Sequence, residues 1–150
     1  MLNNDMKAII AQANLSFVAT VNADGSPNLS PKSTLRPYDD TSLIFANLAS
    51  PGTIENLRRE PRVEVNCIDV FSRRGYRFTG SGTVHSPGDA LYEEFKATME
   101  QELGPDTRVH EAVLVKLEDV KPILSPAYDK EGVTEEGLRK TYFRKYGITE

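Results

Sequence analysis

The chain has 150 residues, enough for one domain with a single hydrophobic core. Its formal net charge is −4, from 18 Lys and Arg against 22 Asp and Glu, and acidic residues are interleaved among the arginines. General binding to nucleic acid or to anionic membranes needs a basic face, so this charge balance argues against both partners.

The single cysteine, Cys67, excludes an internal disulfide framework. The first residues lack the basic region and long apolar core of a signal peptide. No apolar run approaches the ~20 residues that span a bilayer. We therefore expect a cytoplasmic protein in which residues 1–150 form one domain.

The first half of the chain is predicted to hold a helix, three strands and the start of a second helix. Apolar residues recur at helical spacing over residues 5–13. Two strands follow within residues 15–35, joined at Asp24-Gly25, which supplies the positive φ of a tight turn. A second turn at residues 38–41 leads into the apolar strand 42–47, and a helix begins near Gly52.

The second half is predicted to be mostly strand. Pro61 ends the middle helix, and strand 62–70 alternates apolar and polar residues. Strand 76–86 contains Gly80 and Gly82, which indicate a bulge or a close backbone approach. A helix over residues 89–103, a long strand 111–124 and a polar helix over about 134–146 complete the chain.

Six strands joined mostly by tight turns, with helices inserted between them, predict a mostly β (α+β) fold. The expected architecture is a six-stranded antiparallel barrel with flanking helices. The strand–helix alternation of a parallel sheet is missing from the sequence, and neither a repeat nor a low-complexity linker marks a domain boundary.

Several common cofactor and metal motifs are missing from the sequence. The segment from Gly80 to His85 begins like a dinucleotide fingerprint, but it lacks the third glycine and lies inside a strand. There is no phosphate loop and no nucleophile elbow. His85 and His110 lack metal-ligand spacing, so no metal is expected, and Cys67 is interpreted as a small buried hydrophobe.

The strongest functional signal is the run of small residues 47–53, between an apolar strand and a helix. Ser50 could cap that helix with Pro51 at its first position, or Thr53 could cap it with Asn56 three residues on. In both cases backbone amides point outward and can bind an anion. A helix that caps itself needs no ligand, so the pattern leaves both interpretations open.

Lys32, Ser33 and Thr34 are expected at the same end of the sheet as this helix start. If their strand pairs with strand 42–47, an ammonium group and two hydroxyls come close to the helix amides. Such a set can hold a phosphate. The alternative is that Lys32 is a solvated lysine on a strand edge.

The order of these segments resembles a known family. The stretches SFVATVNADGSPNLSPKS, LIFANLASPGTIENLRREPRVEVN and GYRFTGSGTV follow one another as in the FMN-binding split-barrel proteins related to pyridoxamine 5'-phosphate oxidase. The resemblance covers about residues 6–124. It implies a six-stranded split barrel and a homodimer with an FMN at each of two sites between the subunits.

The resemblance also implies positions that bind FMN. The basic position of the second strand falls on or near Lys32, the segment along the flavin on residues 45–47, and the phosphate turn on residues 50–53. This chain has Pro51 and Gly52 where the oxidase has charge, so phosphate binding would rest more on backbone amides and hydroxyls. The predicted cofactor-binding residues are Lys32, Ser33, Thr34, Ala46, Asn47, Ser50, Gly52 and Thr53.

The predicted function is that of an FMN-binding flavoprotein, a small flavin-dependent oxidoreductase of unknown substrate that accepts electrons from a small molecule or a nicotinamide. No catalytic residue is identified, because FMN itself supplies the hydride chemistry. Oxidation of pyridoxamine 5'-phosphate is not expected. The chain ends in a helix instead of the oxidase's arginine-bearing strand, and Arg36, expected on the same strand face as Lys32, would hold the substrate anion alone.

Two alternatives remain open. The protein could be a flavin-binding or redox-carrying module without turnover, or a split barrel that binds haem or a deazaflavin instead of FMN. For haem, His85 or His110 would be the axial ligand. The helix over about 134–146 is a candidate lid on the flavin of its own or of the partner subunit.

Overall fold

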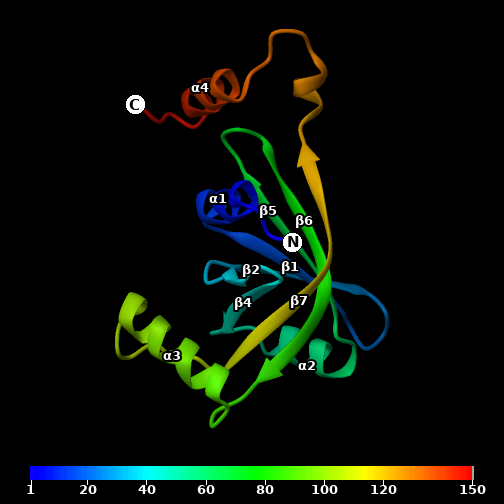
Figure 1. Cartoon of the computed structure of the whole chain (residues 1–150), viewed down its shortest axis with the longest axis vertical. Coiled ribbons are helices and arrows are strands. Elements are labelled where there is room, and N and C mark those ends of the chain that lie inside the picture. Colours follow the sequence, from blue (N-terminus) through cyan, green and yellow to red (C-terminus); the bar gives the residue numbers. More distant parts are fainter. Residues whose placement is uncertain (150) are drawn as a thin grey trace.

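A computed structural model describes residues 1–149 and shows one antiparallel sheet of seven strands in the order β2-β1-β5-β6-β7-β4-β3, flanked by helices (Figure 1). The expected mostly β architecture is confirmed. The strands are β1 Ser16–Val21, β2 Pro27–Lys32, β3 Arg36–Asp39, β4 Ser42–Asn47, β5 Arg62–Asp69, β6 Arg74–His85 and β7 Glu111–Leu124. The helices are α1 Asn4–Ala13, α2 Pro51–Arg59, α3 Ala90–Leu103 and α4 Glu135–Lys145, with a 3₁₀ turn η1 at Pro126–Asp129.

The prediction of six strands missed one, because the predicted second strand is divided in two. β2 ends at Lys32 and pairs with β1, whereas β3 begins at Arg36 and pairs with β4. Leu35, between them, is buried in the main core. Because it turns inward there, the chain leaves its pairing with β1 and begins to pair with β4. Residues 30–34 therefore do not pair with β4, and Arg36 does not share a strand face with Lys32.

Two glycines stand where their predicted roles require them. Gly25, in the turn between β1 and β2, has a φ of +84°. At Gly80 the register between β6 and β7 shifts. A Cβ on Gly80 would lie 2.1 Å from the carbonyl oxygen of Lys116, so β6 and β7 approach too closely for any side chain. The predicted bulge and the predicted close approach are both confirmed there.

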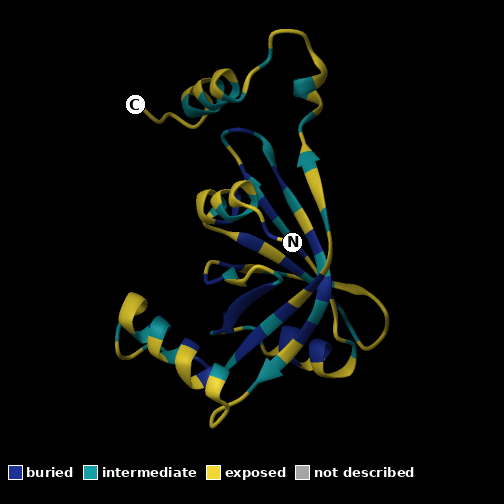
Figure 2. Ribbon diagram, in the orientation of Figure 1, coloured by how far each residue is buried: buried dark blue, intermediate teal, exposed yellow. Residues whose placement is uncertain are grey.

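β4 lies between two hydrophobic clusters, and all six of its residues are buried (Figure 2). Leu43 and Phe45 belong to the main core, which also contains residues of α1, β1, β5 and β6. Ile44 and Ala46 belong to a second cluster with Phe95 of α3. Because side chains alternate along a strand, β4 serves both clusters at once, which fixes its position firmly.

The sheet closes into a barrel along one line of side-chain hydrogen bonds, which joins β2 and the residues after it to the end of β4 and the start of α2. β2 and β3 are the sheet edges, and β3 pairs only with the first half of β4 among the described residues. Beyond β3, the backbone N of Ala46 donates a hydrogen bond of 3.0 Å to the Thr34 hydroxyl. We call this line the seam; its residues are Ser30, Lys32, Thr34, Ala46, Asn47 and Ser50.

The segment after β7 packs on the turn between β5 and β6, at the end of the molecule away from α2 and α3 (Figure 1). Arg139 of α4 donates a 2.8 Å hydrogen bond to Asp69. The rings of Phe71 and Phe143 pack edge to face with centroids 4.7 Å apart. The predicted helix 134–146 is thus confirmed as α4. Within one chain it contacts this turn and lies away from the seam.

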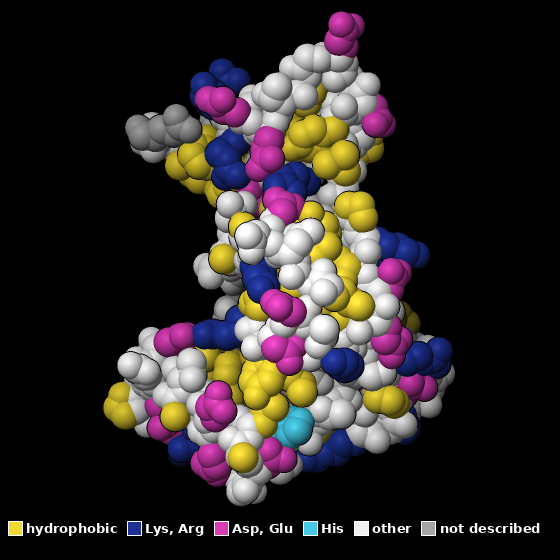
Figure 3. Space-filling model, in the orientation of Figure 1, with side chains coloured by type: hydrophobic (Ala, Val, Ile, Leu, Met, Phe, Trp, Pro, Cys, Tyr) yellow, Lys and Arg dark blue, Asp and Glu magenta, His cyan; other side chains and the backbone are white. Residues whose placement is uncertain are grey.

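Charge on the surface is mixed. On the face shown in Figure 3, basic and acidic side chains are interspersed, without a large patch of one sign. Among the described residues, no helix has the length and apolar character needed to cross a membrane.

Candidate functional site

Lys32 is a buried cation at the centre of the seam, with 6% of its surface exposed. Its Nζ donates hydrogen bonds to the hydroxyls of Ser30, at 2.8 Å, and Ser50, at 2.5 Å. Within residues 1–149, no carboxylate lies at ion-pair distance from it. Burial therefore lowers the pKa of Lys32, and hydroxyl dipoles rather than an opposite charge stabilise the ammonium.

The first turn of α2 begins in one of the two predicted ways. Ser50 is the N-cap residue, and Pro51 follows at the first helical position. The Ser50 hydroxyl accepts no capping hydrogen bond from the amides of the first turn of α2, because it lies beside Lys32 and Ser30 instead. The amides of Gly52 and Thr53 thus receive no acceptor from Ser50, at the positive end of the helix dipole.

Thr53 supplies a second sign of a missing partner. Its side chain is 2% exposed, and its Oγ1 is buried without a hydrogen-bond partner in the described part of the chain. Leaving a buried hydroxyl unpaired costs free energy. The unpaired hydroxyl, the ammonium of Lys32 and the first-turn amides are the donor types that bind a phosphate, so the residues present fit the phosphate of FMN.

The other buried residues of the predicted site have hydrogen-bond partners within the protein. Asn47 is 3% exposed; its Nδ2 donates to Glu111 at 3.1 Å, and its Oδ1 accepts from the backbone N of Ser50 at 2.7 Å. The backbone amide of Ala46 donates a hydrogen bond to the Thr34 hydroxyl. These hydrogen bonds fix the turn that leads into α2. Both polar atoms of the Asn47 side chain already have partners within the protein.

Two predicted residues are exposed, and one of them lies apart from the site. Ser33 is exposed and lines a separate depression beside α1, together with Lys7 and Asn14. Gly52 is exposed, and a Cβ there would meet open space. The structure therefore brings Lys32, Thr34, Ala46, Asn47 and Ser50 together, places Gly52 and Thr53 at the helix start, and leaves Ser33 apart.

The sequence reasoning missed two residues that organise the site. Ser30 lies two positions before Lys32 on β2, and the period of two in a strand could have identified it. Asn56 is 4% exposed and donates to Thr20 at 3.0 Å and to Asn22 at 2.9 Å, which ties α2 to the β1–β2 hairpin. No sequence signal distinguishes Asn56 from an ordinary polar helix residue.

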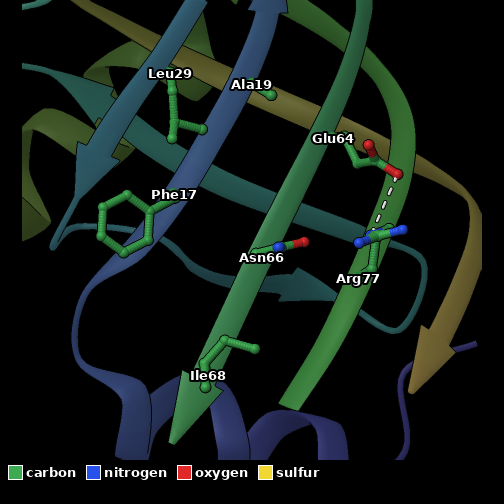
Figure 4. A pocket seen from close by; sticks show the side chains of 7 residues that line it. All are labelled: Phe17, Ala19, Leu29, Glu64, Asn66, Ile68 and Arg77. Carbon is green, nitrogen blue, oxygen red and sulfur yellow. Dashed lines mark ion pairs between the residues drawn. The ribbon is translucent and has the colours of Figure 1, made fainter. Parts of the chain in front are cut away.

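A second region of interest is an apolar depression of about 330 Å³ on the outer face of the sheet (Figure 4). Phe17 is 41% exposed and Leu29 is 65% exposed. Arg77 and Glu64 form an ion pair of 3.7 Å at one side. Exposed apolar surface of this kind often marks a contact with another protein. The lining residues are Phe17, Ala19, Leu29, Glu64, Asn66, Ile68 and Arg77.

Of the two histidines considered for haem, His110 is exposed and His85 has protein partners. His85 Nδ1 lies 3.0 Å from Asp89, and its Nε2 lies 3.0 Å from the Thr83 hydroxyl. Within residues 1–149, no group of three or more His, Cys, Asp and Glu side chains is arranged to hold a metal ion. Cys67 is buried, and desolvation raises the pKa of its thiol to about 11, as fits a small buried hydrophobe.

An antiparallel sheet that closes through side chains along one seam, with helices at its edges, is a split barrel. The chain belongs to the pyridoxamine 5'-phosphate oxidase family, whose sequence profile matches residues 2–122. The resemblance stated above is therefore confirmed, and α4 lies beyond the matched residues. No curated protein sequence matched the chain.

Solved structures share the fold. HupZ from Group A Streptococcus is 28% identical with a TM-score of 0.74, over 83% of this chain and 96% of that one. An FMN-binding protein from Syntrophomonas wolfei subsp. wolfei is 14% identical with a TM-score of 0.67, over 80% and 84%. An F420 reductase is 16% identical with a TM-score of 0.62, over 80% and 98%. At the identities of the last two, the likeness concerns the fold alone.

Proposed function

We propose that the protein is an FMN-binding flavoprotein and a small flavin-dependent oxidoreductase, with the FMN phosphate at Lys32 and the first turn of α2. Membership of the family and the likeness to an FMN-binding protein support this proposal. The observation that carries it is the buried ammonium of Lys32, which has hydroxyl partners but no counter-charge within residues 1–149.

A phosphate would correct three unfavourable features together. It would supply negative charge to the desolvated Lys32, an acceptor to the unpaired Thr53 hydroxyl, and an anion to the positive end of α2. Each feature has an ordinary structural explanation alone. Their common place at or beside the start of α2 favours an anionic ligand.

Once bound, FMN supplies the hydride chemistry, and the protein binds and orients it. β4 suits that role because burial on both faces prevents it from shifting. Oxidation of pyridoxamine 5'-phosphate is not part of the proposal. Arg36, the candidate for its phosphate, already makes two hydrogen bonds to Glu102, at 2.7 and 2.8 Å, and lies 5.7 Å from the Phe95 ring.

We further propose a homodimer in which the outer-face depression meets a second copy and FMN lies between the subunits. The exposed Phe17 and Leu29 support an apolar contact there. A cleft between two copies holds a flat ligand more easily than the filled interior of a small barrel. Since α4 lies away from the seam of its own chain, a lid made by α4 would serve the partner's flavin.

The test is a titration of cofactor-free protein with FMN, FAD and riboflavin. We expect FMN to bind most tightly, because the other two lack a free phosphate monoester. Equal affinity for FMN and riboflavin would remove the phosphate assignment. Sedimentation should show a dimer, and a monomer that still binds FMN tightly would contradict the proposed interface.

A deazaflavin is the second candidate, since an F420 reductase shares the fold. A visible spectrum of the purified protein separates bound flavin, deazaflavin and haem. To separate an enzyme from a redox carrier, the FMN-loaded protein is mixed with a nicotinamide reductant and an electron acceptor. Steady turnover supports the oxidoreductase, whereas reduction without turnover supports the carrier.

A further inference from the structure

Two serines from different elements of the fold contact the ammonium of Lys32. Ser30 lies on β2, in register with Val18 of β1, so the sheet fixes its position. Ser50 lies in the turn between β4 and α2. The two hydroxyls are 3.1 Å apart, and both accept a hydrogen bond from Lys32.

Ser50 has another role open to it. A serine at the N-cap usually accepts a hydrogen bond from an amide in the first helical turn. Here the Ser50 hydroxyl is beside Lys32, and the described first turn receives no such bond. Ser50 thus provides at Lys32 what an oxygen of a bound anion would provide.

We propose that Ser50 is an internal, exchangeable occupant of the anion site, and that Ser30 is the positioning residue that keeps Lys32 in place. This inference rests on the proposed binding of FMN. An arriving phosphate oxygen replaces the Ser50 hydroxyl at Nζ, while Ser30 keeps its contact. Both open amides of α2 are then left to the phosphate.

Replacing either serine by alanine removes one hydroxyl from the same ammonium, so the two variants are matched controls for each other. Ser30→Ala loosens the lysine that must meet the phosphate and should weaken FMN binding. Ser50→Ala removes the group that the phosphate must displace and should strengthen it. The inference thus predicts opposite signs for two chemically identical deletions.

The experiment is calorimetric titration of the cofactor-free full chain with FMN and with riboflavin. For Ser30→Ala we expect the Kd for FMN to rise about fivefold, the usual scale of one hydrogen bond, with the Kd for riboflavin unchanged. For Ser50→Ala we expect the Kd for FMN to fall about two- to fivefold, because one hydrogen bond no longer has to be exchanged. Ser30→Thr retains the hydroxyl and should restore the affinity of the wild type.

Thermal melts of the cofactor-free proteins check that both variants fold. Weaker FMN binding by a folded Ser50→Ala would make Ser50 a direct ligand of the phosphate and overturn the exchange. Unchanged FMN binding by Ser30→Ala would overturn the positioning role. If the wild type bound FMN and riboflavin equally, the proposed function and this inference would both fall, and that outcome is recognisable without any variant.

Discussion

The chain buries two charged groups in opposite ways. Asp69 is 2% exposed and accepts hydrogen bonds from the Ser72 hydroxyl at 2.7 Å, the Phe71 backbone at 3.1 Å and Arg139 at 2.8 Å. Lys32 is 6% exposed, and its partners within residues 1–149 are two neutral hydroxyls. The first charge is neutralised inside the fold, whereas the second lacks an opposite charge there.

Their pKa values reflect this difference. Burial raises the pKa of Asp69, but the hydrogen bonds and Arg139 outweigh burial and leave its pKa below the ordinary value of 3.8. Burial alone lowers the pKa of Lys32 from 10.5. A neutralised buried charge stabilises structure, and one without a counter-charge is the better indicator of a ligand. Four predictions test that distinction.

The largest expected effect is from Asp69→Ala. The change leaves Arg139 with only its longer contact to Glu135, at 3.9 Å, and removes the acceptor that holds the β5–β6 turn. The free energy of unfolding should fall by about 3 kcal/mol. Urea denaturation measures it. Glu136→Ala, which removes an exposed ion pair with Lys140, is the control and should cost less than about 0.5 kcal/mol. Similar losses in both variants would contradict the comparison.

Lys32→Met should weaken FMN binding but not stability, the reverse of Asp69→Ala. FMN binding should weaken by about 1.5–3 kcal/mol, the scale of a hydrogen bond to a charged group. The cofactor-free protein should be at least as stable as the wild type, because an apolar chain of similar length replaces a desolvated charge. Fluorescence titration and urea denaturation give the two values. Unchanged FMN affinity would return Lys32 to a structural role.

Arg36→Ala should have a smaller effect than either. The pair with Glu102 is partly exposed, at 33% and 45%, so its loss should cost about 1 kcal/mol or less. FMN affinity should not change, since Arg36 binds Glu102 of α3 and does not contact the seam.

The FMN-loaded wild type should not oxidise pyridoxamine 5'-phosphate at a useful rate. Robust turnover that disappears in Arg36→Ala would show that Arg36 holds the substrate.

The pH dependence should be the subtlest difference. The folded pKa of Asp69 is below the unfolded one, so its stabilisation is present above about pH 4 and is lost as the pH falls further. The folded pKa of Lys32 is also lowered, so stability should rise with pH between that pKa and 10.5. Denaturation of the wild type and of Lys32→Met across the alkaline range isolates the second effect. A rise that persists in Lys32→Met would assign it to another group.

Most of the fold could be predicted because its signals are local. The Asp24-Gly25 turn, the alternation of β5 and the small residues before α2 each indicate a structure within a few positions. The seventh strand could not be predicted in this way. It depends on Leu35 reaching a core built by distant strands, which no local pattern reports.

The candidate site was predictable in composition but not in contacts. Lys32 was chosen for an expected strand pairing that does not occur, and Ser50 was chosen for its place at the start of a helix. They meet because the start of α2, directly after β4, lies beside β2. Ser33 follows Lys32 directly but lies in the bend after β2, and its exposed side chain lines the separate depression beside α1. The exchange proposed for Ser50 depends on a competition between two partners that are brought together only by the folded structure.

The close approach at Gly80 bears on how genetic screens of this protein would be interpreted. A side chain there must push the Lys116 carbonyl and with it β7, which is paired with β4 along six residues. If FMN binds as proposed, a screen for variants that no longer bind it would therefore recover substitutions at Gly80 beside those at Lys32. Loss of thermal stability would identify the Gly80 substitutions as distant lesions that reach the seam through the sheet.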